Sequence, residues 1–280
     1  MTERKNEIFS APTAQDQLRA GPAEAGGHRF DVPVVEVPLP SNGIVYPTEH
    51  PFHGKENILI DAMTTRQENI LTNRTFAKQG TLLSHLISSV IKERGVDPRS
   101  MLTGDRNTVM IGLRISGYGA DYKVQLKCPA CSESFSQEFN LSDLPVRRLE
   151  LVPIEPGRNM FELTLPASKV TVIFKFLTGA DEEEIAATQV RRKKQNLESS
   201  ELVTQSLMYS VISIAGETDR TKISRVINSL LAADSRALRK YIQDNEPGMQ
   251  MKGWMECPNC DHSEEVEMPL GANFFWPDAK

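Results

Sequence analysis

Two short cysteine motifs, far apart in the sequence, constrain the fold of this chain more than any other feature. Cys128 to Cys131 and Cys257 to Cys260 are both C-P-x-C, and they contain all 4 cysteines of the 280 residues. A C-x-x-C turn places two thiolates on one side of a metal ion, and a second such turn completes a tetrahedral four-thiolate site. The two motifs therefore predict one metal site, with Cys128, Cys131, Cys257 and Cys260 as its ligands.

Residues on both sides of the first motif alternate between apolar and polar types, which is typical of the strands of a β-hairpin. The apolar members are Tyr122, Val124 and Leu126 before the motif and Phe135, Phe139 and Leu141 after it. The second motif has a weaker alternation, with Met255 before it and Val266 and Met268 after it. We therefore expect two hairpins that share one metal ion, forming a split zinc ribbon.

Four cysteines could also form two redox pairs, two disulfides or a set of buried thiols. A redox C-x-x-C motif normally opens a helix in a thioredoxin-like unit, whereas predicted strands flank both motifs here. A reducing compartment also keeps thiols available for metal. We therefore predict structural Zn²⁺, with iron in a rubredoxin-like site as the less favoured metal.

The residues next to the motifs qualify this prediction in two ways. Ser132 and Asp261 stand directly after the two motifs, where glycine is frequent, so we expect strained turns. His262 could replace a ligand, but four thiolates already complete a closed structural site.

The overall charge does not favour nucleic-acid binding. The chain has 32 basic and 37 acidic residues, a net charge of -5 and a pI near 5.7, whereas many nucleic-acid binders carry a basic surplus. No apolar stretch approaches the roughly 18 residues that a transmembrane helix needs, and the first residues lack the apolar region of a signal peptide. We therefore expect a soluble chain that is made in the cytoplasm and has no membrane partner.

The sequence contains no recognisable catalytic constellation. It has no glycine-rich phosphate loop, and its 5 histidines, at positions 28, 50, 53, 85 and 262, are scattered. Asp105 and Arg106 precede an apolar run, where charged residues more commonly cap a helix than catalyse a reaction. We therefore predict that the protein is not an enzyme and has no small-molecule substrate, and we assign no catalytic or cofactor-binding residue.

Composition and periodicity divide the chain into three parts. Residues 1–32 contain few large apolar side chains and are predicted to form a flexible arm. Residues 33–145 together with 250–280 are expected to form an α+β core of short helices and hairpins that carries the split ribbon. Residues 146–249 lie between the two motifs and are predicted to be an insertion, with a hairpin at about residues 161–176 followed by a small helical bundle.

Capping signals place the first two helices. Thr65 and Glu68 are interpreted as a capping box, and Gly80 stands where this helix should end. A second helix is expected between Thr81 and Gly95, because its apolar residues form one stripe at helical spacing.

Three further segments are also expected to be helical. The apolar run at residues 109–115 fits either a helix capped by Asp105 or a buried strand, and we favour the helix. Residues 207–212 are assigned to a helix of the insertion. Asp234 is expected to cap the last helix before Pro247.

Three consecutive aromatic residues, Phe274, Phe275 and Trp276, lie near the C-terminus. They could fill the protein's own core. Phe and Trp are also typical anchors of protein interfaces, and a terminal segment can reach a partner. We therefore regard all three as candidate partner-binding residues.

Several segments together resemble a known family. They are Leu39–Tyr46, Met63–Thr72, Gly104–Asn107 and Ile115–Gly119, followed by the first cysteine motif, and more loosely the second motif with Phe274 to Pro277. This set resembles the baseplate hub subunit and baseplate assembly family of T-even-like contractile-tailed bacteriophages. The resemblance covers about residues 37–145 well, and it does not extend to the N-terminal arm or the insertion.

The resemblance implies a structural or assembly component of a phage tail baseplate, in the hub region, without catalytic activity. Its partners would be other tail and baseplate proteins, and its location the virion tail after assembly in the host cytoplasm. Two alternatives stay open. One is a tail assembly chaperone that is absent from the mature virion, and the other is a zinc-ribbon nucleic-acid-binding protein.

Overall fold

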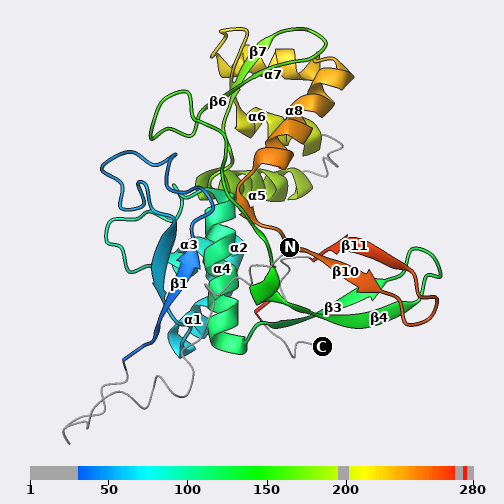
Figure 1. Ribbon diagram of the computed structural model, residues 1–280. Coiled ribbons are helices and arrows are strands. Elements are labelled where there is room, and N and C mark those ends of the chain that lie inside the picture. Colours follow the sequence, from blue (N-terminus) through cyan, green and yellow to red (C-terminus); the bar gives the residue numbers. More distant parts are fainter. Residues whose placement is uncertain (1–30, 195–201, 269–273, 276–280) are drawn as a thin grey trace, which may run out of the picture.

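The computed structural model describes residues 31–194, 202–268 and 274–275, so the predicted arm at residues 1–32 lies almost wholly outside the described part. Helices alternate with small antiparallel sheets, which confirms the α+β class. Figure 1 shows a body built around one long helix, a ribbon of two hairpins that projects from it, and an upper unit of strands and helices. Within the described ranges, no helix is long and apolar enough to cross a membrane.

The long helix of the body is α4, Thr103–Tyr118, which confirms the helix predicted at residues 109–115. It packs against a two-stranded sheet of β1, Val34–Pro38, and β2, Asn57–Asp61. A side chain at Gly112 would bring its Cβ within 2.4 Å of Val37 Cγ1. Only glycine therefore lets the sheet approach the helix so closely.

Asp105 does not cap α4, contrary to the prediction. The cap position is Leu102, and Asp105 lies in the first turn of the helix with no exposed surface. Its carboxylate accepts hydrogen bonds from the Tyr46 hydroxyl at 2.6 Å and the Ser41 backbone N–H at 2.9 Å. Burial raises the pKa of this carboxyl group above its ordinary value. Asp105 therefore joins the helix to the loop after β1.

The first predicted helix is in fact two short ones. They are α1, Thr65–Leu71, and α2, Arg74–Gln79, and the Asn73 side chain caps the second. The capping box also begins one residue earlier than predicted, because the Gln67 side chain accepts the backbone N–H of Thr64 at 3.0 Å. Gly80 ends α2 in the left-handed conformation, with φ 73°, as expected.

The next helix, α3, Leu82–Ser88, is shorter than predicted. The chain after it is extended, because Val90 O accepts the N–H of Asp61 and Lys92 N–H donates to Leu59 O, at 2.8 and 3.1 Å. These bonds cover the outer edge of β2. Tertiary pairing therefore replaces the last helical turns.

Two hairpins form the projecting ribbon, which we define as residues 121–140 and 252–267. The first pairs β3, Asp121–Lys127, with β4, Ser134–Asn140. The second pairs β10, Lys252–Glu256, with β11, Ser263–Glu267. After the first hairpin, the short 3-10 helix η3, Leu141–Asp143, leads to β5, Val146–Arg147, which pairs with β9, Gly248–Met249, at the base of the upper unit.

The upper unit contains the expected hairpin of β6, Phe161–Thr164, and β7, Thr171–Phe174. The helical assignment of residues 207–212 is wrong at its end, because α6, Leu202–Ser210, is followed by a strand, β8, Val211–Ile214, that pairs with β7. The other helices are α5, Gly179–Lys194, α7, Arg220–Asn228, and α8, Ala232–Asn245.

Asp234 does not cap α8, whose cap position is Leu231. The Asp234 carboxylate instead accepts the backbone N–H groups of Ala167 and Ser168, at 2.8 and 2.9 Å. It therefore orients the turn of the β6–β7 hairpin from the side of α8.

The apolar side chains of the body and the upper unit form two cores. The larger one unites α3, α4, the β1–β2 sheet and the C-terminal aromatic residues. The smaller one lies in the upper unit and consists of Leu165, Val172, Leu207, Val211, Ile214, Ile223, Ile227 and Leu238. Phe161 of β6, Phe174 of β7 and Phe176 just after β7 belong to the larger core. The upper unit therefore has a core of its own but is also anchored in the body.

Candidate metal centre

The two cysteine motifs form matching turns at the tips of the two hairpins. In the first, Cys128 N–H donates to Glu133 O at 2.8 Å and Ser132 N–H donates to Cys128 O at 2.9 Å. In the second, the equivalent bonds are Cys257 N–H to His262 O at 2.9 Å and Asp261 N–H to Cys257 O at 3.1 Å. The same backbone path therefore presents each cysteine pair.

Each turn carries a strained residue, as the sequence predicted. Ser132 has φ 63° and Asp261 has φ 54°, a left-handed conformation that glycine adopts at less cost. Such strain persists where surrounding interactions determine the backbone. Both hairpins therefore contain the same kind of backbone strain next to the cysteines that they present to the cluster.

The four sulfur atoms gather in one cluster and lie within 4.8 Å of one another. Cys128 Sγ lies 3.7 Å from Cys260 Sγ, and Cys131 Sγ lies 3.6 Å from Cys257 Sγ. These separations exceed the S–S bond length of about 2.05 Å. A tetrahedral ion with Zn–S bonds of about 2.3 Å requires sulfurs about 3.8 Å apart. The spacing of the thiols therefore fits a metal and not disulfides.

The cluster is buried on one side and open on the other. Cys128 and Cys257 are buried, Cys131 is half-buried and Cys260 is exposed. Met255, which is fully buried, and the partly buried side chains of Leu126, Phe135 and Val266 complete the apolar side. An ion could therefore enter from solvent and then be shielded by apolar groups.

The pKa shifts of the thiols also favour a bound cation. Backbone hydrogen bonding at Glu133, with the Asn259 side chain, lowers the pKa of Cys131 to about 6. Hydrogen bonding at the His262 backbone acts to lower the pKa of Cys260, but contact with Cys131 and burial outweigh it and raise this pKa to about 12. Adjacent thiols cannot all ionise without a compensating positive charge. A divalent cation would supply that charge.

His262 is not part of the cluster, which among the described residues consists of the four cysteines alone. Its Nε2 atom lies 3.5 Å from a Glu264 carboxylate oxygen. The donor set is therefore four soft thiolates, which suit zinc or iron.

Two contacts that the sequence did not reveal also hold the hairpins together. The Gln137 side chain donates to Trp254 O at 2.7 Å and accepts the N–H of Glu256 at 3.0 Å. Gly253 lies under the Phe139 ring, where an added Cβ would be 2.6 Å from Cδ1 and Cε1. The period-two pattern placed Phe139 on a buried face, but nothing in the sequence paired it with Gly253.

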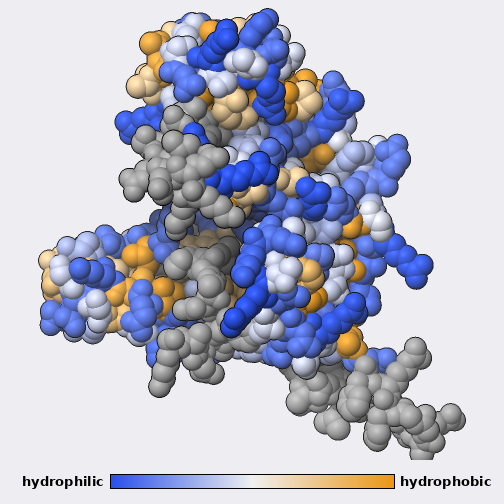
Figure 2. All heavy atoms as spheres, turned by 180° about the vertical axis from the view of Figure 1, so that it is seen from behind, coloured by the Kyte–Doolittle hydropathy of each residue, from blue (hydrophilic) through white to orange (hydrophobic). Residues whose placement is uncertain are grey.

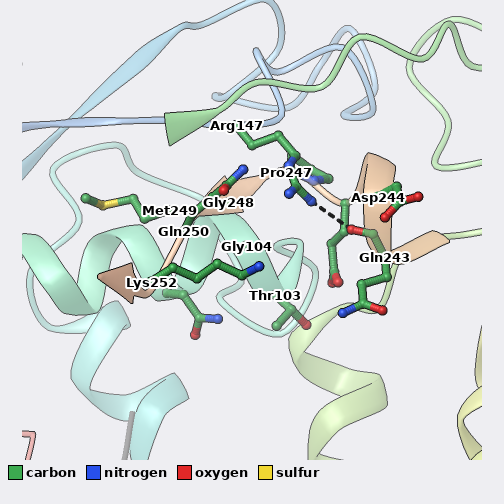
Figure 3. A pocket seen from close by; sticks show the side chains of 12 residues that line it. Thr103, Gly104, Arg147, Gln243, Asp244, Pro247, Gly248, Met249, Gln250 and Lys252 are labelled. Atoms are coloured by element: carbon green, nitrogen blue, oxygen red, sulfur yellow. Dashed lines mark hydrogen bonds between the residues drawn. The ribbon is translucent and has the colours of Figure 1, made fainter. Parts of the chain in front are cut away.

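Apart from the cysteine cluster, a pocket lies between the start of α4 and the end of α8, at the base of the upper unit (Figure 3). Its volume is about 300 Å³. Arg147 crosses it and donates to Gln243 O at 2.7 Å. The lining mixes Arg147 and Lys252 with Asp244 and Glu246. Among these described side chains there is no nucleophile paired with a base.

Two of the candidate partner-binding residues lie in the protein's own core. Phe274 is 1% exposed and Phe275 is 5% exposed, and the Phe274 ring packs edge-on against Tyr122 at 5.3 Å. Trp276 lies outside the described residues. A role of these three residues in partner binding stays a prediction, and the observed contacts assign Phe274 and Phe275 a packing role.

Comparison with known proteins gives a family match that includes the body, both cysteine motifs and the upper unit. The model of the family described as "T4 bacteriophage base plate protein" matches residues 38–276. No curated protein and no solved structure matches the chain significantly.

Proposed function

Because the chain belongs to the T4 bacteriophage base plate protein family, we propose that it acts in the hub region of a contractile-tail baseplate by protein–protein association. At the coarser level, the family makes it a phage baseplate structural protein. The single observation that carries the proposal is the extent of the match, because residues 38–276 include every described element from β2 to the second hairpin. The family indicates a non-enzymatic role in the virion tail.

We also propose that the four cysteines bind one structural Zn²⁺ ion and form a split zinc ribbon. The sulfur separations of 3.6 and 3.7 Å support this assignment. The ion would join residue 128 to residue 260 and so close the chain across the whole upper unit. Structural zinc contributes about 10 kcal/mol or more of apparent binding energy to folding in small zinc domains.

Residues 146–249 are proposed to act as an inserted subdomain on the core formed by 33–145 with 250–280. The separate core between Leu165 and Leu238 supports this division, and the β5–β9 pair stands where the chain leaves and returns. The insertion would present partner contacts above the body.

The charge of the ribbon argues against the nucleic-acid-binding alternative. Residues 121–140 and 252–267 carry Lys123, Lys127 and Lys252 against Asp121, Glu133, Glu138, Glu256, Asp261, Glu264, Glu265 and Glu267. Nucleic-acid binding instead needs a basic surface that replaces counterions at the phosphates. A salt-sensitive gel shift with DNA or RNA should therefore not occur.

Purified contractile tails test the location. We expect mass spectrometry of mature tails to detect this chain, and the isolated protein to bind a tail component. Presence during assembly with absence from mature tails would favour the chaperone alternative. Absence from tails together with no binding to any tail component would refute both.

Elemental analysis tests the metal. We expect about one zinc per chain, and none in a Cys257→Ser/Cys260→Ser double variant. A four-thiolate iron site would be coloured, whereas zinc is not, because its d shell is full. A metal content far below one equivalent in freshly purified protein would refute the proposed site.

A further inference from the structure

The outer face of the second hairpin gathers charged residues around one aromatic ring. The strand register pairs Lys252 with Glu267, Trp254 with Glu265 and Glu256 with Ser263. Because side chains alternate across a sheet, these six residues share one face. We name it the Trp254 face. The opposite face carries Met255, which is fully buried, and Gly253, which lies against Phe139.

Trp254 is unusually exposed for its size. The residue is 65% exposed, and it is the one aromatic residue among the large exposed apolar residues of the described part. It stands on the ribbon, which projects from the body in Figure 1 and is also seen from behind in Figure 2. Tryptophan is enriched at interface hot spots because one rigid ring buries a large area. An exposed ring on a projecting arm is therefore well placed to meet a partner.

The charged residues around the ring determine which sign of charge a partner must carry. Glu256, Glu265 and Glu267 are all exposed, and the sole cation of the face, Lys252, pairs with Glu265 at 3.3 Å. The Trp254 face therefore has a net charge of -2, from three carboxylates and one ammonium group. Association of charged surfaces favours opposite signs, so the complementary segment is cationic.

The backbone under Trp254 is held in place before any partner arrives. Gln137 bonds to Trp254 O and to the N–H of Glu256, and Cys257 of the cysteine cluster follows directly. Flexible surface side chains lose entropy on binding, whereas a fixed strand loses little. The strand that carries the ring is therefore preorganised.

We propose that the Trp254 face binds an arginine-bearing segment of another protein, with a guanidinium group stacked on the indole and paired with a neighbouring carboxylate. Arginine suits this face better than lysine, because its planar guanidinium stacks on aromatic rings and bonds carboxylates in bidentate fashion. The inference rests on the proposed function only in that the segment is assigned to a baseplate neighbour. The chemistry of the face is independent of that assignment.

Tryptophan fluorescence tests the chemistry directly. The chain has 2 tryptophans, so a Trp276→Phe variant reports on Trp254 alone. This full-length variant is titrated with three synthetic peptides of equal length, in which a Gly-Ser repeat carries two arginines, two lysines or two glutamates. We expect a saturable change in emission with the arginine peptide, affinity several-fold weaker with lysine, and no saturation with glutamate.

Variants on the face provide the matched controls. Peptide binding by variants that lack the reporter ring is followed by calorimetry. Trp254→Ala should abolish binding of the arginine peptide, and Trp254→Phe should retain part of it. Glu256→Gln/Glu267→Gln should weaken binding about tenfold, whereas Glu138→Gln on the other hairpin should not. Circular dichroism and thermal unfolding confirm that each variant is folded.

Equal affinity for the arginine and glutamate peptides, or unchanged binding in Trp254→Ala, would overturn the proposal. A homodimer that dissociates on Trp254→Ala would also overturn it, because a second copy would then occupy the face. These outcomes are separable from the proposed function, because detection of the chain in tails does not depend on Trp254. Conversely, absence from tails would leave the peptide result intact.

Discussion

Replacing Arg114 with methionine should lower the free energy of unfolding by about 3–5 kcal/mol, because its buried guanidinium joins three separate segments. Arg114 is 1% exposed. Its Nε donates to Phe274 O at 2.9 Å, its Nη1 to Gly119 O at 2.6 Å and its Nη2 to Asp121 O at 2.9 Å. The side chain thus connects the end of α4, the start of β3 and the C-terminal aromatic segment.

The magnitude follows from these contacts. A hydrogen bond from a charged donor contributes about 1.5–3 kcal/mol, and a buried carbonyl left without a partner, here that of Phe274, costs about 1–3 kcal/mol. The three bonds share one cation and are not additive. Burial also lowers the pKa of Arg114, so removing the charge recovers some desolvation energy. Both corrections reduce the sum to about 3–5 kcal/mol.

Urea unfolding followed by circular dichroism measures the effect. Arg225→Met is the matched control, because Arg225 is exposed on α7 and the same substitution there should change stability by less than about 0.5 kcal/mol. Arg114→Lys should fall between the two, because an ammonium group cannot reach all three carbonyls. A loss below about 1 kcal/mol in Arg114→Met would refute the reasoning.

Three other perturbations have clear expected outcomes. Chelation of the proposed Zn²⁺ ion, or Cys260→Ser, should lower the thermal midpoint sharply along with zinc content, and an unchanged midpoint after complete zinc removal would contradict a structural role. Gly253→Ala should cost about 1–3 kcal/mol in thermal unfolding, because its Cβ would lie 2.6 Å from the Phe139 ring, and adding Phe139→Leu should recover part of the loss if overlap is the cause. Burial raises the pKa of Asp105, so the folded state favours the protonated form of this carboxyl group. The contribution of Asp105 to the free energy of unfolding is therefore present at low pH and is lost as pH rises through the folded pKa. Unfolding measured between about pH 4 and pH 7 should therefore favour the wild type over Asp105→Asn progressively as pH falls, and a constant difference would show that the pKa is not raised.

Local patterns predicted those features that depend on neighbours in the sequence. The period of two before and after Cys128 identified the first hairpin, and Gly80 marked the end of a helix because its φ of 73° suits glycine. The cysteine cluster was also predictable, because the only 4 cysteines stand in two equal motifs. The α+β class followed from the same alternation of helical and strand-like patterns.

Other features depended on distant partners and were missed for that reason. Residues 211–214 resemble a continuation of α6, but they form a strand because β7 offers them backbone hydrogen bonds. A similar competition ends α3 beside β2. Asp234 and Asp105 are residues of a type that often caps helices, yet their carboxylates accept hydrogen bonds from donors 66 and 59 residues away. In each case a long-range hydrogen bond, which forms only in the folded chain, overrides the local preference for a helix or a helix cap.

The sequence by itself determined that two C-P-x-C turns must lie at the ends of hairpins, because spacing and alternation are local properties. Only the tertiary structure decided what surrounds them. The Gln137 amide and the Gly253–Phe139 contact arise where the second hairpin meets the first, and they leave the Trp254 ring exposed on the other face of that hairpin. Such contacts join residues more than 100 positions apart, and a one-dimensional pattern carries no information about which distant side chains will meet.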